Sequence, residues 1–211
     1  MKILALEFSS EVRSVAFGDI SSSDVPILTE SSDRSTTGIE LVDQTLRQAK
    51  AIPEEVDVLA VGLGPGSYGG IRSAIALAQG WQLARGTRLL GISSFVVLLR
   101  EAEKRGFLGR VAIMIDAQRN EFYHAEFALE KGSSQEIVPL AIVPIQSIPG
   151  ESRRVGPRVG RLVPGGTNLN PSAATLLELA AGRSDFTPGE NLEPIYLRET
   201  SFVKAPPARF S

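Results

Sequence analysis

The chain has 211 residues, of which 43% are hydrophobic and 22% charged, and its formal net charge is −2. This composition is typical of a folded globular protein, and the charge excludes a protein that holds a nucleic-acid backbone by charge alone. Because the chain contains no cysteine, disulfide frameworks, thiolate metal sites and cysteine nucleophiles are excluded as well.

The apolar start of the chain, Ile3–Leu6, is too short to be the hydrophobic region of a secretory signal. No uncharged apolar run elsewhere is long enough to span a bilayer. We therefore predict a cytoplasmic protein without membrane contact.

Strands and helices alternate in the first half of the chain. Lys2–Phe8 and Val56–Val61 are apolar almost throughout, which is typical of strands buried on both faces. Apolar residues recur at helical spacing over 39–49, and Ile71–Arg85 has neither proline nor acid, so both are predicted helices. The remaining predicted elements are strands at Val12–Gly18, Val25–Thr29 and Arg88–Ile92 and a helix capped by Ser93 that runs through Lys104. The expected order is βββαβαβα.

After Gly106 the order of elements restarts. The predicted strands are Val111–Asp116, Phe122–Leu129, Glu136–Val143 and a short one near Arg161–Val163, and a helix follows from Pro171 to Ala181. This pattern predicts two lobes, residues 1–106 and 107–211, the second a shortened copy of the first. A single α/β sheet with a hairpin extension remains the alternative. The tail Pro206–Arg209 is expected to be mobile.

A glycine-rich loop joins the fourth predicted strand to the second helix. Gly64, Gly66 and Gly69 spell GxGxxG, the pattern of dinucleotide-binding loops. That motif also requires an acid about 20 residues later, on the nucleotide ribose. No acid lies between Asp57 and Glu101, so the dinucleotide interpretation fails.

Two other phosphate or nucleophile motifs are also absent from this loop. No lysine is present for a Walker A loop, and Pro65 replaces the first glycine of a nucleophile elbow around Ser67. What remains is a weak nucleotide or anion site at Gly64, Gly66 and Ser67, or a structural turn in which glycine permits close backbone approach.

Polar residues also follow the first strand. An acid and hydroxyls at Glu7, Ser9 and Ser10 are suited to holding Mg²⁺ through water, or phosphate. The alternative is that Glu7 caps a turn and the serines are turn residues.

The sequence predicts neither a catalytic residue nor a metal site. His124, the only histidine, cannot form a paired-histidine metal site, and we expect it on the surface of a strand. The one basic cluster lies in a Gly/Pro-rich stretch and is expected to be a solvated loop, with an RNA phosphate contact as the alternative. It consists of Arg153, Arg154, Arg158 and Arg161.

The predicted helix Ile71–Arg85 is apolar nearly all round and must be covered on more than one side. One stripe, from Ile71 to Ala78, suits its own sheet. The other consists of small residues that let another helix approach closely. This stripe packs either on the preceding helix of its own chain or on the same helix of a second molecule. In the second case the expected interface comprises Ser73, Ala76, Gly80 and Ala84, with Leu41 and Thr45 of the preceding helix.

Three segments resemble the bacterial TsaB (YeaZ-like) family, which takes part in threonylcarbamoyladenosine modification of tRNA. Residues 62–84, which contain GLGPGSYGGIRSA, are similar to its G-x-GPGSFTG-x-R signature. The segment IDAQRNEFYHAEF at 115–127 is similar to IDAR-x-x-E-V-Y-x-A, and EPIYLR at 193–198 to E-P-x-Y-L-R. The chain departs from the family pattern at Glu7-Phe8-Ser9, where Asp-Thr-Ser/Ala is common, and at Tyr68-Gly69, where Phe-Thr is usual.

The resemblance implies a two-lobed actin/sugar-kinase-like fold with ribonuclease H-like lobes. It further implies a non-catalytic subunit that pairs with the TsaD transferase, works with the ATPase TsaE, meets tRNA only through the complex, and forms a homodimer when alone. The histidine pair through which TsaD binds metal is missing here. No cofactor is assigned; ATP or ADP would sit in the inter-lobe cleft or at the complex interface. An ATP-dependent phosphotransferase of the same superfamily is the alternative function.

Overall fold

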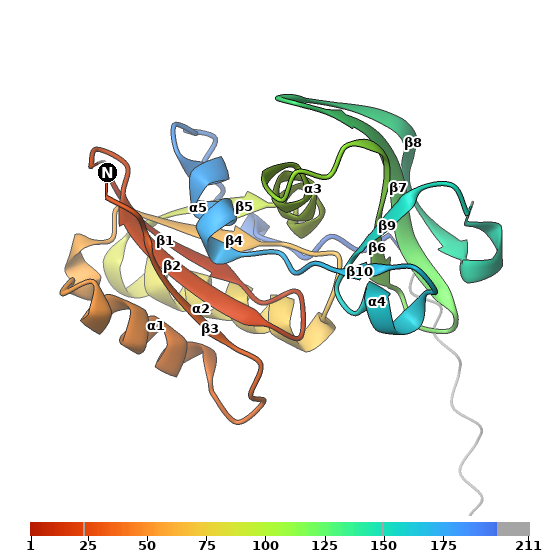
Figure 1. Ribbon diagram of the computed structural model, residues 1–211. Coiled ribbons are helices and arrows are strands. Elements are labelled where there is room, and N and C mark those ends of the chain that lie inside the picture. Colours follow the sequence, from red (N-terminus) through yellow and green to blue (C-terminus); the bar gives the residue numbers. More distant parts are fainter. Residues whose placement is uncertain (23, 149, 198–211) are drawn as a thin grey trace, which may run out of the picture.

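Two five-stranded sheets form the framework of the molecule (Figure 1). The structure is a computed structural model, in which residues 1–22, 24–148 and 150–197 are described. The sheets have the strand orders β3-β2-β1-β4-β5 and β8-β7-β6-β9-β10. Each has an antiparallel half and a parallel half, so the second lobe repeats the topology of the first.

The first sheet is built around β1, whose two neighbours run in opposite directions. Its strands are β1 (Lys2–Glu7), β2 (Arg13–Asp19), β3 (Ile27–Ser31), β4 (Val58–Gly62) and β5 (Arg88–Ile92). β1 pairs antiparallel with β2 and parallel with β4. This arrangement follows from the sequence, since the β1–β2 connection is a short turn whereas β1 and β4 are separated by a long crossover.

Helices cover both faces of the first sheet (Figure 1). The helices are α1 (Gly38–Gln48), α2 (Tyr68–Arg85), α3 (Ser94–Lys104) and α5 (Ala173–Ala180). Alternate residues of β1 serve two cores: Leu4 and Leu6 pack with α1 and α2, while Ile3 and Ala5 pack with α5. α3 lies between the sheets, where Phe95, Leu98 and Ala102 join the core of the second lobe.

The second lobe is a reduced copy. Its elements are β6 (Gly109–Asp116), β7 (Glu121–Glu130), β8 (Ser133–Pro144), β9 (Arg153–Gly156), α4 (Val159–Leu162) and β10 (Thr167–Asn168). In place of a helix between its third and fourth strands there is only a 3-10 turn, η2 (Ile145–Ser147). Two further 3-10 turns lie at the first lobe. η1 (Pro53–Glu55) stands between α1 and β4 in the chain, and η3 (Gly189–Asn191) packs against α2.

The two-lobed, ribonuclease H-like class predicted from the sequence is confirmed, with one error of assignment. The predicted strand Arg161–Val163 is wrong, because Arg161 lies in α4 and the strands are β9 and β10 on either side. The division at residues 106/107 stays a prediction: the strands respect it, yet α5 from the second half packs on β1 and β2. The predicted mobile tail lies outside the described residues.

Within residues 1–22, 24–148 and 150–197, no helix combines the length and apolar character needed to cross a bilayer.

Candidate functional site: the glycine loop and the α1–α2 groove

The glycine loop connects β4 to α2. α2 begins at Tyr68, three residues earlier than predicted, because Ser67 acts as its N-cap. The Ser67 hydroxyl accepts the Gly70 N–H at 3.4 Å, and this satisfies one of the donors left open at a helix start. Ser67, which the sequence analysis named as a candidate anion-binding residue, therefore caps α2.

The loop rests directly on the backbone that follows β1. Ser67 N–H donates to the Ser9 carbonyl at 2.7 Å. A Cβ added at Gly66 would lie 2.2 Å from that carbonyl oxygen, and one at Gly70 would lie 2.0 Å from the Phe8 carbonyl oxygen. The glycines are thus required for close backbone approach. The carbonyl oxygens of Phe8 and Ser9 lie against these two glycines, and carbonyl oxygens repel anions.

A buried carboxyl group lies beneath the same loop. The Glu7 side chain is fully buried, and its Oε1 accepts the Ser9 N–H at 2.9 Å and the Ser94 hydroxyl at 3.2 Å. Ser94 Oγ in turn accepts the Gly64 N–H at 3.0 Å. Glu7 Oε2 has no hydrogen-bond partner and packs against Gly62, where an added Cβ would lie 2.1 Å away. The network ties β1, the loop and α3 together.

These contacts do not fit a nucleotide phosphate or a hydrated Mg²⁺ at this loop. Burial raises the pKa of Glu7 above its ordinary value, although hydrogen bonds from Ser9 and Ser94 oppose the shift. Ser10 bonds only within its own turn, where its hydroxyl donates to the Val12 carbonyl at 2.8 Å and accepts the Val12 N–H at 3.2 Å. Of the two interpretations that the sequence left open, the geometry favours the structural turn.

The raised pKa of Glu7 leads to a prediction about stability and pH. Because the folded state holds this proton more tightly than the unfolded chain, stability falls as pH rises from the ordinary pKa of 4.5 through the folded pKa. In Glu7→Gln the amide oxygen can still accept hydrogen bonds from the Ser9 N–H and the Ser94 hydroxyl, and the side chain cannot become charged. We expect Glu7→Gln to melt higher than the unmodified chain at pH 8, and the difference to shrink toward pH 4.5. Equal melting temperatures at pH 8 would contradict a raised pKa of the buried Glu7 carboxyl.

A second feature of the first lobe is an open apolar groove between α1 and α2. Its volume is about 650 Å³. All four small residues predicted at an interface line it, namely Ser73, Ala76, Gly80 and Ala84. The other lining residues are Leu6, Ile39, Val42, Pro53, Leu59, Leu77, Trp81 and Arg85. The other predicted stripe of α2, from Ile71 to Ala78, is buried and packs on the sheet as expected.

Large apolar side chains of α1 and α2 face solvent. Ile39, which lines the groove, is 65% exposed, and Leu83, elsewhere on α2, is 89% exposed. A Cβ added at Gly80 would meet nothing within 4 Å, so the glycine is not required by the lobe's own interior. Because a glycine inside a helix costs about 1 kcal/mol relative to alanine, an open Gly80 suits close approach of another chain.

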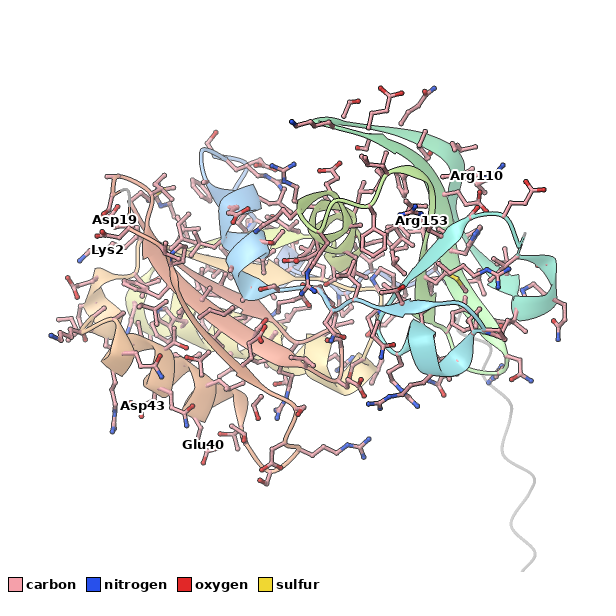
Figure 2. All side chains as sticks on the ribbon, in the orientation of Figure 1. Lys2, Asp19, Glu40, Asp43, Arg110 and Arg153 are labelled. Carbon is pink, nitrogen blue, oxygen red and sulfur yellow. The ribbon has the colours of Figure 1, made fainter. Side chains whose placement is uncertain are left out.

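The predicted interface residues Leu41 and Thr45 are corrected by the structure. Both are buried on the inward face of α1, where Thr45 Oγ1 donates to the Leu41 carbonyl at 2.7 Å. The helical period places them with Val42 and Leu46 toward the sheet, opposite the solvent side that carries Glu40 and Asp43 (Figure 2). They support α1 from within and are not available to a partner.

The expectation that His124 lies on a strand surface is wrong. β7 is paired with β6 and β8 along its two edges, and the His124 side chain is buried, 3.3 Å from Glu126 Oε1. Burial lowers the pKa of His124, although nearby Glu126 opposes the shift. Glu126, which the sequence analysis missed, is fully buried and accepts from Arg110 and from the Ser152 hydroxyl. The sequence did contain a signal for this pair, since residues two apart on a strand, such as His124 and Glu126, lie on the same face of the sheet.

The basic residues of the second lobe do not act as one group. Arg158 Nε lies 4.0 Å from Glu11 Oε2, which links the second lobe to the turn after β1. Arg153 and Arg154 belong to β9, whereas Arg161 belongs to α4. Figure 2 shows Arg153 and Arg110 in the second lobe. The RNA alternative for this cluster stays a prediction.

An exposed cluster of two aromatic rings and one cation lies at the start of α2. It was not predicted from the sequence. The Tyr68 and Tyr196 rings have centroids 6.0 Å apart. The Arg72 guanidinium lies 5.2 Å from the Tyr68 ring centroid and donates to the Tyr68 hydroxyl at 3.2 Å. Tyr68 is 61% exposed and Tyr196 is 51% exposed. The fold thus brings together two segments that carry the family resemblance, residues 62–84 and the segment that contains Tyr196.

Comparison with known proteins decides the family. The family model of the tRNA N6-adenosine threonylcarbamoyltransferase TsaD matches residues 29–180. The chain belongs to the TsaB/YeaZ family, a branch related to TsaD. The tRNA threonylcarbamoyladenosine biosynthesis protein TsaB of Escherichia coli K12 is 26% identical over 99% of this chain and 100% of its own length. TsaB of Haemophilus influenzae is 28% identical over 98% of each chain.

A solved TsaB/YeaZ structure has the same fold. YeaZ from Pseudomonas aeruginosa aligns with a TM-score of 0.77 and 25% identity over 93% of this chain and 99% of its own. The alignment extends over nearly the full length of both chains. The resemblance inferred from three short segments is therefore confirmed across both lobes.

Proposed function

We propose that this chain is a non-catalytic subunit for threonylcarbamoyladenosine modification of tRNA, and that it pairs through the α1–α2 groove with a TsaD-like transferase subunit. The groove is the observation that carries the proposal. It is apolar, open and lined by small side chains on α2, including Ser73, Ala76 and Gly80. An exposed apolar surface of this kind is typical of a protein interface.

The non-catalytic role is supported by the state of the polar groups in the first lobe. The glycine-loop donors examined above are engaged by Ser9, Ser67 and Ser94, and the Glu7 carboxyl is buried without access to a substrate. The same contacts argue against the phosphotransferase alternative, which needs an open phosphate cradle. A nucleotide in the complex would have to use groups other than these.

The remaining partners follow from the resemblance. A TsaE-like ATPase would act on the assembled pair, and tRNA would be held by the complex, since the net charge of −2 gives this chain little attraction for a polyanion. When the transferase subunit is absent, the same groove would pair two copies of this chain. These reactions would take place in the cytoplasm.

Reconstitution tests the proposal directly. The chain is co-purified with its cognate TsaD-like subunit, and modified adenosine in tRNA is measured with and without the chain. We expect a stable pair and modification that requires both proteins. Full modification in a strain that lacks this chain's gene would overturn the proposal. So would turnover of a sugar or acid substrate by the isolated chain with Mg-ATP.

A further inference from the structure

The Tyr68–Arg72–Tyr196 cluster lies at the N-terminal end of the exposed face of α2. The chain that carries Tyr196 is fixed to the first lobe. Ile195 N–H donates to the Leu63 carbonyl at 2.9 Å. The Gln79 amide donates to the Gly189 carbonyl at 2.8 Å, and Gly189 N–H donates back to Gln82 at 2.8 Å. The cluster is therefore held in place before a partner arrives, which reduces the entropy lost on binding.

Arg72 has unused binding capacity. A hydrogen bond with Tyr196 is the largest cause that raises the pKa of Arg72, and Tyr68 is the next contributor. None of the causes identified among the described residues is a carboxylate. A guanidinium carries five N–H donors in a planar fork that matches a carboxylate. Arg72 therefore presents a positive charge beside the exposed Tyr68 ring, and within residues 1–22, 24–148 and 150–197 no acidic partner is identified for it.

The two helices that border the groove, α1 and α2, are poorly equipped to supply that acid from a second copy of this chain. α2 contains no Asp or Glu at all. On α1, the Glu40 carboxylate already accepts from the N–H and hydroxyl of Thr37. Asp43 pairs with Arg47 at 3.0 Å. Glu40 and Asp43 project into solvent from α1 (Figure 2), but each is engaged within its own helix.

We propose that Tyr68, Arg72 and Tyr196 form an acid-binding anchor that receives a carboxylate side chain of the transferase subunit and so favours that subunit over a second copy of this chain. This rests on the proposed function, because the anchor extends the same α2 face. Tyrosine and arginine are the residues that most often dominate interface energies. A carboxylate can accept two parallel hydrogen bonds from the guanidinium group, and its negative charge balances the positive charge of Arg72.

Charge reversal separates the anchor from the groove. The full-length Arg72→Glu chain is titrated with the cognate transferase subunit, and its self-association is measured by light scattering. We expect hetero-complex affinity to fall about 30-fold or more, with self-association changed by less than about twofold. Arg72→Lys, which keeps the charge without the fork, should lose affinity to a smaller extent. Arg105→Glu, the same change at an exposed residue after α3, is the matched control and should bind normally.

The outcomes are distinct from those that test the groove. If Gly80→Arg abolishes transferase binding but Arg72→Glu leaves it intact, the anchor is wrong and the proposed function stands. If both associations weaken equally in Arg72→Glu, the anchor does not discriminate between partners and the inference is overturned. Binding of a single-stranded oligoribonucleotide that is lost in Tyr68→Ala, with transferase binding unchanged, would assign the rings to a nucleobase and overturn it as well.

Discussion

Gly80→Arg is expected to leave a folded monomer that neither self-associates nor binds the transferase subunit. A side chain at this position meets nothing within the lobe, so the fold tolerates it. In an assembled interface the arginine would fill the groove beside Ala76 and Ala84, and its charge would be buried without a partner. A penalty of about 3 kcal/mol or more corresponds to at least a hundredfold loss of affinity. Light scattering gives the mass, and circular dichroism checks the fold.

Gly80→Ala is the matched control. Its methyl group is too small to close the groove, and it removes the helix penalty of glycine, so we expect association to persist and stability to rise by about 1 kcal/mol. Ala76→Arg should repeat the effect of Gly80→Arg from the adjacent turn. A dimer that survives both arginine variants would show that the partner does not use the groove. Loss of the native circular dichroism spectrum would instead assign the stripe to the core.

Much of the first lobe could be predicted from the sequence because its elements follow simple periodicities. The continuous apolar run at Lys2–Phe8 indicated a strand covered on both faces, and the two stripes of α2 separated its sheet-facing side from the groove. Leu41 and Thr45 were wrongly predicted at the interface, since the prediction did not follow the helical period of α1. That period directs both residues inward with Val42.

The second lobe and the site contacts were harder to predict, since they depend on tertiary partners. His124 alternates with its neighbours as a surface residue would, yet β7 is central and buries it beside Glu126. The Tyr68–Arg72–Tyr196 cluster joins segments that no local pattern relates. The state of Glu7 likewise depends on Ser94, which reaches it from α3.

Gly66→Ala is expected to destabilise the chain more than any other single methyl group added to the loop that leads into α2. The added Cβ would lie 2.2 Å from the Ser9 carbonyl oxygen, and Gly66 has a φ of +152°, which side-chain-bearing residues rarely adopt. Both obstacles are backbone, so no side chain can move aside to relieve them. We expect a loss of about 3 kcal/mol, or roughly 10 °C in melting temperature for a chain of this length.

Gly69→Ala is the matched control, because a Cβ there meets nothing within 4 Å. It should melt within about 2 °C of the unmodified chain, since it adds the same methyl group to the first turn of α2 without a clash. Thermal melts of the two variants therefore isolate close approach of the loop to Ser9. If Gly66→Ala keeps its melting temperature but loses binding of inorganic phosphate or ATP, the loop is an anion site and the structural interpretation is wrong. Equal, small losses in both variants would mean that the loop and the Ser9 backbone separate in solution.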